Sequence, residues 1–395
     1  MNESTTPVIV SAVRTPIGRY MGGLSGLTAP QLGAIVIREA VARARIEPGA
    51  VDEVIMGQVV QGGSGQAPAR QAAINAGLPG TVPALTINKV CGSGLKAVML
   101  AAQAIKAGDA GCVVAGGQES MSTAPYYLFG YRQGVKAGNQ TLVDGVIHDG
   151  LWCSFGCNHM GEYAEYTAET AGIGRADQDA FALESHRKAI AAQEAGKFAA
   201  EIVPVQVPGK GGAATVAADE APRKDTSLEA LGRLKPAFRK EGTVTAGNAP
   251  GLNDGASAVV VTSLAFARAH GLEPMARITA YATGGGEPRD LFFAPIVAVR
   301  NLMAKAGTTI EDYDLIEANE AFAVQALADG RALGWDWERV NVHGGAVALG
   351  HPIGASGARV LTTLLHAMRD RGARTGLATL CLGGGNAVAL SVERI

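Results

Sequence analysis

The 395-residue sequence lacks the features that mark several classes of protein. Its formal net charge is only −2, so it has no strong field to attract nucleic acid. No apolar run approaches the roughly 20 residues that span a bilayer, and the start, MNESTTPVIV, is not laid out like a signal peptide. Its five cysteines are odd in number, which argues against a secreted disulfide framework. We therefore expect a cytoplasmic protein with reduced thiols, and neither nucleic acid nor membrane as a partner.

Strand and helix patterns alternate along the chain, which predicts an α/β fold. Strands are expected at 8–13, 52–60, 85–90 and 112–117, and a helix with a threonine cap and an early proline is expected at 28–44. Residues 93–107, SGLKAVMLAAQAIKA, are apolar on nearly all sides of a helix, which indicates that this helix is buried all round.

A weak internal repeat relates the two ends of the chain. In the first half a strand ending in VDEVIMG precedes CGSG, an apolar helix and the strand CVVAGG. In the second half YDLIEAN precedes GASG, another apolar helix and the strand LCLGG, with similar spacing. Matched order and spacing favour duplication over chance. The region between, about 123–250, is more polar and irregular, with a helix at 177–196, and it is interpreted as an insertion that binds substrate.

Cys91, in INKVCGSGLK, stands where a strand turns into the first apolar helix. The positive end of a helix dipole favours a thiolate, which would lower the pKa of this thiol and make it nucleophilic. A buried apolar role is the common alternative for a single cysteine. Gly92-x-Gly94-x-x-Ala97 also approximates a dinucleotide-binding turn, but the nearest acidic residue, Glu119, comes later than that motif requires.

The second half places a histidine at the junction that corresponds to Cys91. His351, in ALGHPIGASG, precedes the second apolar helix, and histidine is the usual base for a catalytic thiol. Cys381 ends the strand TLCL before three glycines, and Asn319 ends the strand before His351. If the two halves pack face to face, these strand ends lie at one switch point, where α/β sheets bind ligands.

A metal site has weaker support. Cys153-x-x-x-Cys157-x-His159 offers three potential zinc ligands without a fourth nearby, and neither a P-loop nor H-E-x-x-H occurs. No metal and no bound cofactor are expected.

The chain resembles the thiolase family from end to end. The motifs that carry the resemblance are VRTPIGRYMGGL, NKVCGSGLKAV, GGQESMS, GTVTAGNAPGLNDGA, IEANEAFA, NVHGGAVALGHPIGASG and CLGGGNAVA. The resemblance implies two pseudo-repeated α/β halves stacked as α-β-α-β-α layers, with an inserted loop domain. The halves would be 1–121 with 252–273, and 274–395, around an insertion at 122–251. It also implies a homo-oligomer, either dimer or tetramer.

By this resemblance Cys91 is the nucleophile that accepts an acyl group, and His351 activates it. Cys381 is the acid/base that acts on the α-proton of acetyl-CoA. Asn319 would hold a water that, with His351, forms one oxyanion hole, and the amides of Cys91 and Gly383 would form the other. The implied activity is acetyl-CoA C-acetyltransferase: reversible Claisen condensation of two acetyl-CoA to acetoacetyl-CoA and CoA, by ping-pong kinetics.

Coenzyme A thioesters are then the substrates, and no other cofactor is needed. The positions that carry over as CoA or substrate contacts are Leu151, His159, Met160, Arg223, Phe238, Ala249 and Phe322, with Arg223 at the nucleotide end. Pro250 departs from the family, because it replaces a common serine and offers no hydrogen-bond donor.

The His159-Met160-Gly161 element resembles short-chain members of the family, although Glu162 and Tyr163 replace smaller residues. A degradative 3-ketoacyl-CoA thiolase of broader chain length is the nearest alternative. A decarboxylating ketosynthase is more distant, since such enzymes pair their cysteine with two histidines. A dinucleotide-binding oxidoreductase and a non-catalytic acyl-CoA carrier remain as alternatives from other classes.

Overall fold

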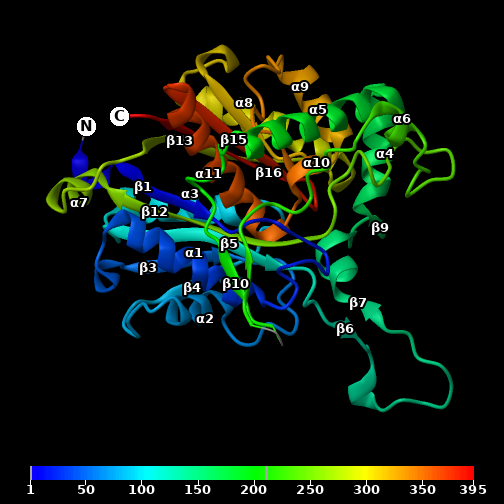
Figure 1. Cartoon of the computed structure of the whole chain (residues 1–395), viewed down its shortest axis with the longest axis horizontal. Coiled ribbons are helices and arrows are strands. Elements are labelled where there is room, and N and C mark those ends of the chain that lie inside the picture. The colour runs from blue at the N-terminus through cyan, green and yellow to red at the C-terminus, as the bar shows by residue number, and fades with distance from the viewer. Residues whose placement is uncertain (1, 210–211) are drawn as a thin grey trace.

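The first half of the chain forms one side of a mixed sheet in the computed structural model, which describes residues 2–209 and 212–395 (Figure 1). The strand order here is β1-β12-β5-β3-β4, and β2 pairs with β12. Their bounds are β1 Pro7–Arg14, β2 Gly18–Arg19, β3 Glu53–Gly57, β4 Ala84–Ile87, β5 Cys112–Ser120 and β12 Asn253–Ser263. Every residue of β1, β5 and β12 is buried, so these strands are covered on both faces.

The second half repeats this arrangement with the order β14-β15-β16-β13. The strands are β13 Ala276–Gly285, β14 Leu315–Ala318, β15 Thr375–Leu382 and β16 Asn386–Glu393. A short pairing of Val8 with Arg277 and of Ile9 with Ala276 joins β1 to β13. The two half-sheets are thereby connected along one edge.

Two apolar helices lie between the half-sheets, as the sequence predicts: α3 (Ser93–Ala107) and α11 (Ile353–Arg371). Glycine lets them approach closely. A Cβ on Gly94 would lie 2.6 Å from the backbone nitrogen of Ala358, and one on Gly357 would lie 2.3 Å from that of Leu95. The crossing therefore occurs at the N-terminal ends of both helices, just beyond Cys91 and His351.

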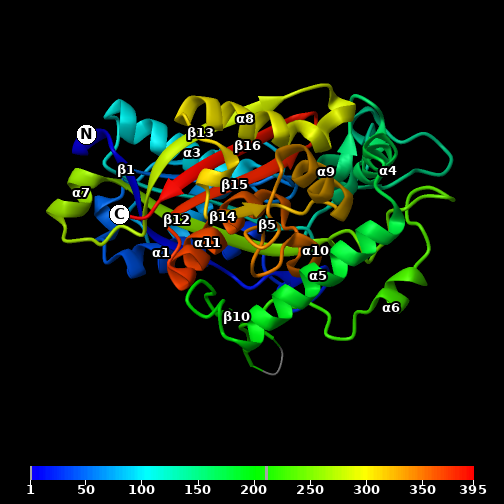
Figure 2. The same ribbon diagram turned by 90° about the horizontal axis from the view of Figure 1, so that it is seen from above.

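Outer helices complete the layers (Figure 2). On one side α1 (Ala29–Ala44) and α2 (Pro68–Asn75) pack on the first half-sheet, and on the other α8 (Ala294–Ala306) packs on β13 and β16. The resulting helix–sheet–helix–sheet–helix order confirms the predicted thiolase-like α/β class.

The predicted elements differ from the observed ones mainly at their ends. The helix expected at 28–44 begins at Ala29, and the amide of Thr28 donates to Oε1 of Gln31 at 2.8 Å. The strand expected at 85–90 stops at Ile87, because residues 88–92 turn to enter α3. Val90 has a φ of 46°, and the hydroxyl of Ser93 donates to its carbonyl.

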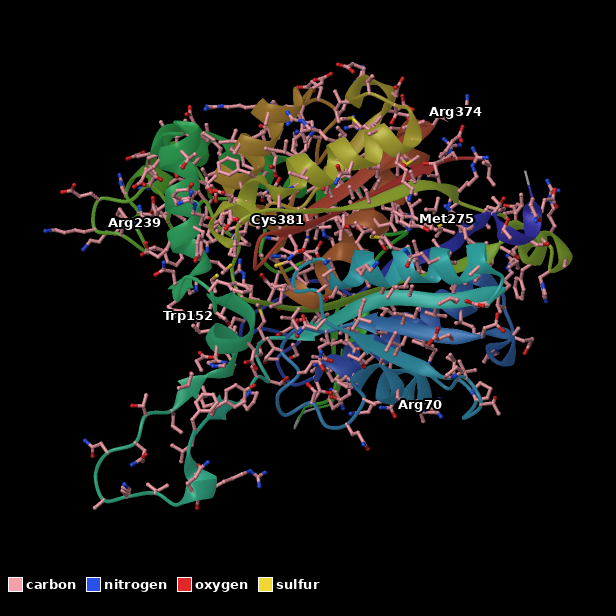
Figure 3. The ribbon with its side chains drawn as sticks, turned by 180° about the vertical axis from the view of Figure 1, so that it is seen from behind. Arg70, Trp152, Arg239, Met275, Arg374 and Cys381 are labelled. Atoms are coloured by element: carbon pink, nitrogen blue, oxygen red, sulfur yellow. The ribbon has the colours of Figure 1, made fainter. Side chains whose placement is uncertain are left out.

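The inserted region leaves the first half after β5 and returns at β12. Its elements are β6 Tyr126–Tyr127, β7 Val143–Asp144, β8 Trp152–Cys153, β9 Asn158–His159, α4 Met160–Ala171, α5 Arg175–Glu194, β10 Val205–Val207, β11 Ala214–Val216 and α6 Leu228–Gly232, with a π-helical turn at Val146–Leu151. The segment around β6 and β7 projects from the body as an arm, with Trp152 at its base (Figure 3). The division at 121/122 and 251/252 stays a prediction.

The remaining helices are short connections. They are α7 Leu264–Ala269, α9 Ala323–Leu333 and α10 Ala346–Leu349. Single 3₁₀ turns lie at Glu3–Thr5, Pro48–Ala50, Tyr131–Gln133 and Ile310–Asp312, and a longer, kinked 3₁₀ segment lies at Pro288–Phe293. Over the described residues, no helix combines the length and apolar character needed to cross a bilayer.

Candidate active site

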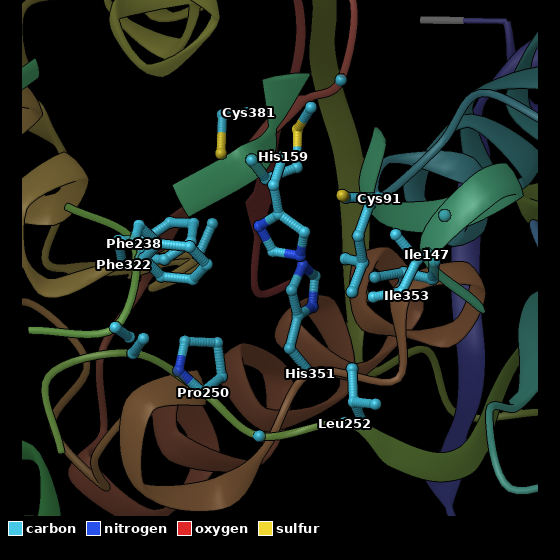
Figure 4. A pocket seen from close by; sticks show the side chains of 18 of the residues that line it. Cys91, Ile147, His159, Phe238, Pro250, Leu252, Phe322, His351, Ile353 and Cys381 are labelled. Atoms are coloured by element: carbon cyan, nitrogen blue, oxygen red, sulfur yellow. The ribbon is translucent and has the colours of Figure 1, made fainter. Parts of the chain in front are cut away.

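A cavity of about 370 Å³ opens where the inserted region meets the ends of the two central helices. Most of the predicted site residues line it: Cys91, His351, Cys381, Gly383, Leu151, His159, Met160, Phe238, Ala249, Pro250 and Phe322. Figure 4 shows the Cys91 and Cys381 sulfurs and the His351 ring directed into the same space. Apolar side chains make up most of the wall, which suits an aliphatic or amide-linked chain better than a charged ligand.

Cys91 occupies the turn between β4 and α3. Gly92 follows it, and a Cβ there would lie 2.5 Å from the side chain of Leu382 at the end of β15. The glycine thus allows the turn to press against the second half, next to Cys381 and Gly383. The close contact of the two halves brings both cysteines to one cavity.

The expectation that helix placement lowers the pKa of Cys91 is wrong for the free protein. Burial of the thiol raises its pKa to about 12, because the thiolate is desolvated. The backbone amides of Gly383 and of Cys91 itself act in the opposite direction on the sulfur, whereas the nearby Glu119 adds to the rise. Cys91 is therefore a neutral thiol at rest.

His351 is held at both ring nitrogens and at its backbone. Its amide donates to Oδ1 of Asn253 at 2.8 Å, and its Nδ1 lies 2.6 Å from Oγ of Ser356. On the other side of the ring, Nδ2 of Asn319 lies 3.4 Å from Nε2. Burial and, secondarily, the charge of Arg359 lower the pKa of His351 to about 3, so the ring is neutral near pH 7.

Asn319 approaches the cavity from behind His351. It directly follows β14, its backbone amide donates to the carbonyl of Thr379 at 3.0 Å, and its side chain is fully buried. Its Oδ1 has no hydrogen-bond partner among the described residues. Asn319 is not itself part of the cavity wall, and its contact with the site runs through His351.

Cys381 is the next-to-last residue of β15 and is only 1% exposed. Burial raises the pKa of its thiol well above the usual value, and the charges of Cys91 and Asp329 act in the same direction. A negative charge on either Cys91 or Cys381 disfavours a negative charge on the other. The pair therefore holds one negative charge more readily than two.

An aromatic group closes the side of the cavity opposite Cys91. The rings of His159 and Phe238 stack with centroids 4.9 Å apart, and Phe322 meets Phe238 edge-on at 6.3 Å. Nδ1 of His159 accepts the backbone amide of Gly161 at 3.1 Å, so in the neutral ring the proton lies on Nε2. Burial lowers the pKa of His159, which favours that neutral form.

Arg223 is the predicted contact that the cavity does not include. It is exposed, and its backbone amide donates to Nδ1 of His186 at 3.2 Å. Its place at the nucleotide end of CoA stays a prediction. Pro250, which replaces the serine common in the family, does line the cavity. Its substitution can therefore affect ligand binding directly.

Neither rival interpretation of the motifs finds a matching site. Glu119, the acid needed by a dinucleotide turn, is fully buried and accepts the amides of Val59, Val60 and Gly354 at 2.9 to 3.2 Å. Its two carboxylate oxygens thus link residues 59 and 60 of the first half to the start of α11. Among the described residues, no group of three or more His, Cys, Asp or Glu side chains is arranged to hold a metal.

Several residues of the site are not among the site residues that the sequence predicts, although some lie within the quoted motifs. The apolar wall includes Met121, Ile147, Leu252, Phe292 and Ile353. Ser356 and Asn253, which position His351, lie within the recognised stretches but look like ordinary polar residues there. The sequence signal for Ser356 is a serine in the first turns of an apolar helix, five residues after the histidine.

Comparison with known proteins agrees with this geometry. Residues 7–265 match the family description "Thiolase, N-terminal domain", and residues 272–394 match "Thiolase, C-terminal domain". The chain is 58% identical to the acetyl-CoA acetyltransferase of Pseudomonas aeruginosa, over 98% of this chain and 99% of that relative. It is 57% identical to the acetyl-CoA acetyltransferase of Cupriavidus necator, over 99% and 100%.

A solved structure extends the agreement to three dimensions. The crystal structure of the acetyl-CoA acetyltransferase of Bacillus anthracis superposes with a TM-score of 0.97 at 44% identity, covering 99% of both chains. Both family models match, and the relatives match over almost their full length, so the family of the chain is established. The chain belongs to the thiolase family.

Proposed function

We propose that this protein is an acetyl-CoA C-acetyltransferase, which condenses two acetyl-CoA to acetoacetyl-CoA and CoA and catalyses the reverse thiolysis. The observation that carries the proposal is the meeting of Cys91, His351 and Cys381 in one apolar cavity. Full-length relatives named acetyl-CoA acetyltransferase, at 58% and 57% identity, support the choice of substrate.

In the first half-reaction the thiol of Cys91 attacks the thioester carbonyl of acetyl-CoA, and its proton passes to Nε2 of His351. The carbonyl oxygen becomes an oxyanion that the amides of Cys91 and Gly383 stabilise. The carbon–sulfur bond to CoA then breaks, and Cys381 protonates the departing thiolate. The products are CoA and acetyl-Cys91, with a proton on His351 and a negative charge on Cys381.

In the second half-reaction the Cys381 thiolate removes the α-proton of another acetyl-CoA. The resulting enolate oxygen faces the Nε2 proton of His351 and a water held by Asn319. The enolate carbon attacks the acetyl carbonyl on Cys91, which forms the new carbon–carbon bond. The Cys91 thiolate leaves and regains its proton from His351, so every group returns to its first state.

The experiment that tests this function is acid quenching after incubation with [¹⁴C]acetyl-CoA, followed by peptide mapping. An acetyl adduct on the Cys91 peptide is expected. Cys157 supplies an internal control, because it is exposed and unconnected with the cavity, so label there reports only non-specific acetylation. Absence of label from the Cys91 peptide, or equal label on Cys157, would overturn the nucleophile assignment.

A short acyl chain is the finer part of the proposal. Met160 and Phe322 line the cavity, and Glu162, two residues after Met160 in α4, pairs with Arg239 at 2.7 Å. Comparison of kcat/KM across 3-ketoacyl-CoA substrates of increasing length tests it. A preference for acetoacetyl-CoA is expected, and a rise with chain length would favour the degradative alternative. Activity that requires a malonyl thioester would favour a ketosynthase.

We further propose a homotetramer or homodimer that works in the cytoplasm, in the metabolism of fatty acids. Exposed apolar side chains gather on the projecting arm: Tyr126 is 59% exposed, Phe129 59%, Tyr131 66% and Leu142 62%. A patch of this kind on a soluble protein marks a contact surface. Light scattering of the wild type and of Tyr131→Glu with Leu142→Glu tests whether this arm joins copies of the chain. All five cysteines are free, which fits a reducing compartment.

A further inference from the structure

The ring of His351 must carry its single proton on a particular nitrogen if it is to act as a base. Its low pKa makes the resting imidazole neutral, and a neutral imidazole has one N–H and one lone pair. Only the tautomer with the lone pair on Nε2 can accept the proton of Cys91 in the reaction described above. Something in the fold has to select that tautomer.

Ser356 supplies the selection through its position in α11. It lies one helical turn after Pro352, and its hydroxyl donates to the Pro352 carbonyl at 2.9 Å. A carbonyl oxygen can only accept, and a hydroxyl has only one proton. With the hydroxyl proton directed at Pro352, Oγ of Ser356 is left to accept from Nδ1 of His351, 2.6 Å away. Nδ1 therefore carries the ring proton.

The contact at the opposite edge of the ring agrees with this tautomer. The amide nitrogen of Asn319 lies 3.4 Å from Nε2, and an amide NH₂ group can only donate. With the amide in this orientation, the nitrogen of Asn319 faces the lone pair of Nε2. Ser356 is 1% exposed, so bulk water does not compete for its contact with Nδ1.

We propose that Ser356 is a positioning residue that keeps the ring proton of His351 on Nδ1 and so leaves Nε2 free to take the proton of Cys91. It does not touch the reacting atoms. Its effect reaches them through the tautomer and orientation of the imidazole, which rest on a hydrogen bond formed within a single helical turn. The inference rests on the proposed function for its kinetic consequence, but the tautomer itself does not depend on any substrate.

The first test therefore uses the protein without acetyl-CoA. Isotope-edited infrared spectra of protein with ¹⁵N-labelled histidine rings, wild type minus His351→Asn, isolate the ring C–N stretch of His351, which differs between the two tautomers. The Nδ1–H tautomer is expected in the wild type, and a mixture or the Nε2–H form in Ser356→Ala. An Nε2–H signal in the wild type overturns the proposal whatever the enzyme's activity.

The second test measures the rate at which Cys91 is acetylated in a single turnover. Ser356→Ala should acetylate about 10-fold to 100-fold more slowly, within the range that general base catalysis contributes, with the apparent Kd for acetyl-CoA changed by no more than about twofold. Ser356→Thr keeps the hydroxyl and should stay within about threefold of the wild type, since threonine makes the same bond to the i−4 carbonyl.

The matched control is Thr362→Val. Thr362 is a fully buried hydroxyl on the same helix, bonded to Ser257 at 2.9 Å and away from the cavity, and valine preserves its shape. It should leave the acetylation rate unchanged. Equal slowing in Thr362→Val, or in Ser356→Thr and Ser356→Ala alike, would assign Ser356 a packing role and contradict the proposal. If no variant acetylates because the wild type does not, the infrared result still decides the tautomer.

Discussion

The rings of His159 and Phe238 lie stacked, 4.9 Å between centroids and 22° between planes, beside Gly161, the second residue of α4. A Cβ on Gly161 would lie 2.2 Å from the Phe238 ring. Glycine at this position is therefore what lets the aromatic wall of the cavity close against the helix.

Gly161→Ala should push Phe238 away from His159 and open the wall of the cavity. We expect KM for acetyl-CoA to rise about tenfold, as for the loss of roughly 1.4 kcal/mol of binding, with a smaller fall in kcat. Steady-state kinetics measure both. Gly232→Ala is the control, because nothing lies within 4 Å of the Cβ it adds. An unchanged KM in Gly161→Ala would show that the stacked pair does not contact the substrate.

Cys381→Ala should separate the two half-reactions. Acetylation of Cys91 should persist at a reduced rate, because its base is His351 and only the acid for the departing CoA thiolate is lost. Condensation should fall by about 100-fold to 10,000-fold, because the group that moves the α-proton is missing. Peptide mapping and a coupled condensation assay measure the two steps. Cys157→Ser, at an exposed thiol, should leave both unchanged. Loss of acetylation and condensation together in Cys381→Ala would contradict this division of roles.

Pro250→Ser should add a hydroxyl to the cavity wall where the chain now has an apolar ring. A new hydrogen bond to the amide-bearing arm of CoA is worth about 0.5 to 1.5 kcal/mol, so KM should fall by about twofold to tenfold with kcat unchanged. Pro250→Ala tests whether any change comes from loosening the backbone instead. A fall in KM that is equal for serine and alanine would assign the effect to the backbone.

Glu119 should make stability depend on pH in an unusual direction. Burial raises its pKa from the usual 4.5 to about 7 in the folded protein, so between these values the folded state holds a proton that the unfolded state has released. Its contribution to the free energy of unfolding is therefore present below pH 4.5 and is lost as pH rises towards 7. The loss is on the order of 3 kcal/mol, at about 1.4 kcal/mol per unit of pKa.

Glu119→Gln removes this titration. The difference in thermal midpoint between wild type and variant should change with pH between about 4.5 and 7 and be constant above that window. Differential scanning calorimetry at several pH values measures it, with Glu47→Gln, at an exposed glutamate, as the control. A difference that does not vary with pH would mean that Glu119 does not titrate there.

Much of the fold could be predicted because its signals are local. The segment 93–107 is apolar all round and is the buried helix α3 with those same bounds, and the repeat placed β14 and α11 in their correct order. The end of β4 was missed, because the turn at Val90 depends on the hydrogen bond from Ser93 and on the contact of Gly92 with Leu382 from the other half. Contacts between distant segments leave no periodicity in the sequence.

The sequence by itself determined the chemistry available to this protein: two cysteines, a histidine and an asparagine, in the order of the thiolase family. Only the tertiary structure decided their states. Desolvation, which depends on everything packed around a group, makes Cys91 a neutral thiol rather than the thiolate expected from its helix end. The same packing keeps His351 neutral and fits Ser356 and Asn319 against its two nitrogens, which decides the nitrogen that can act as the base.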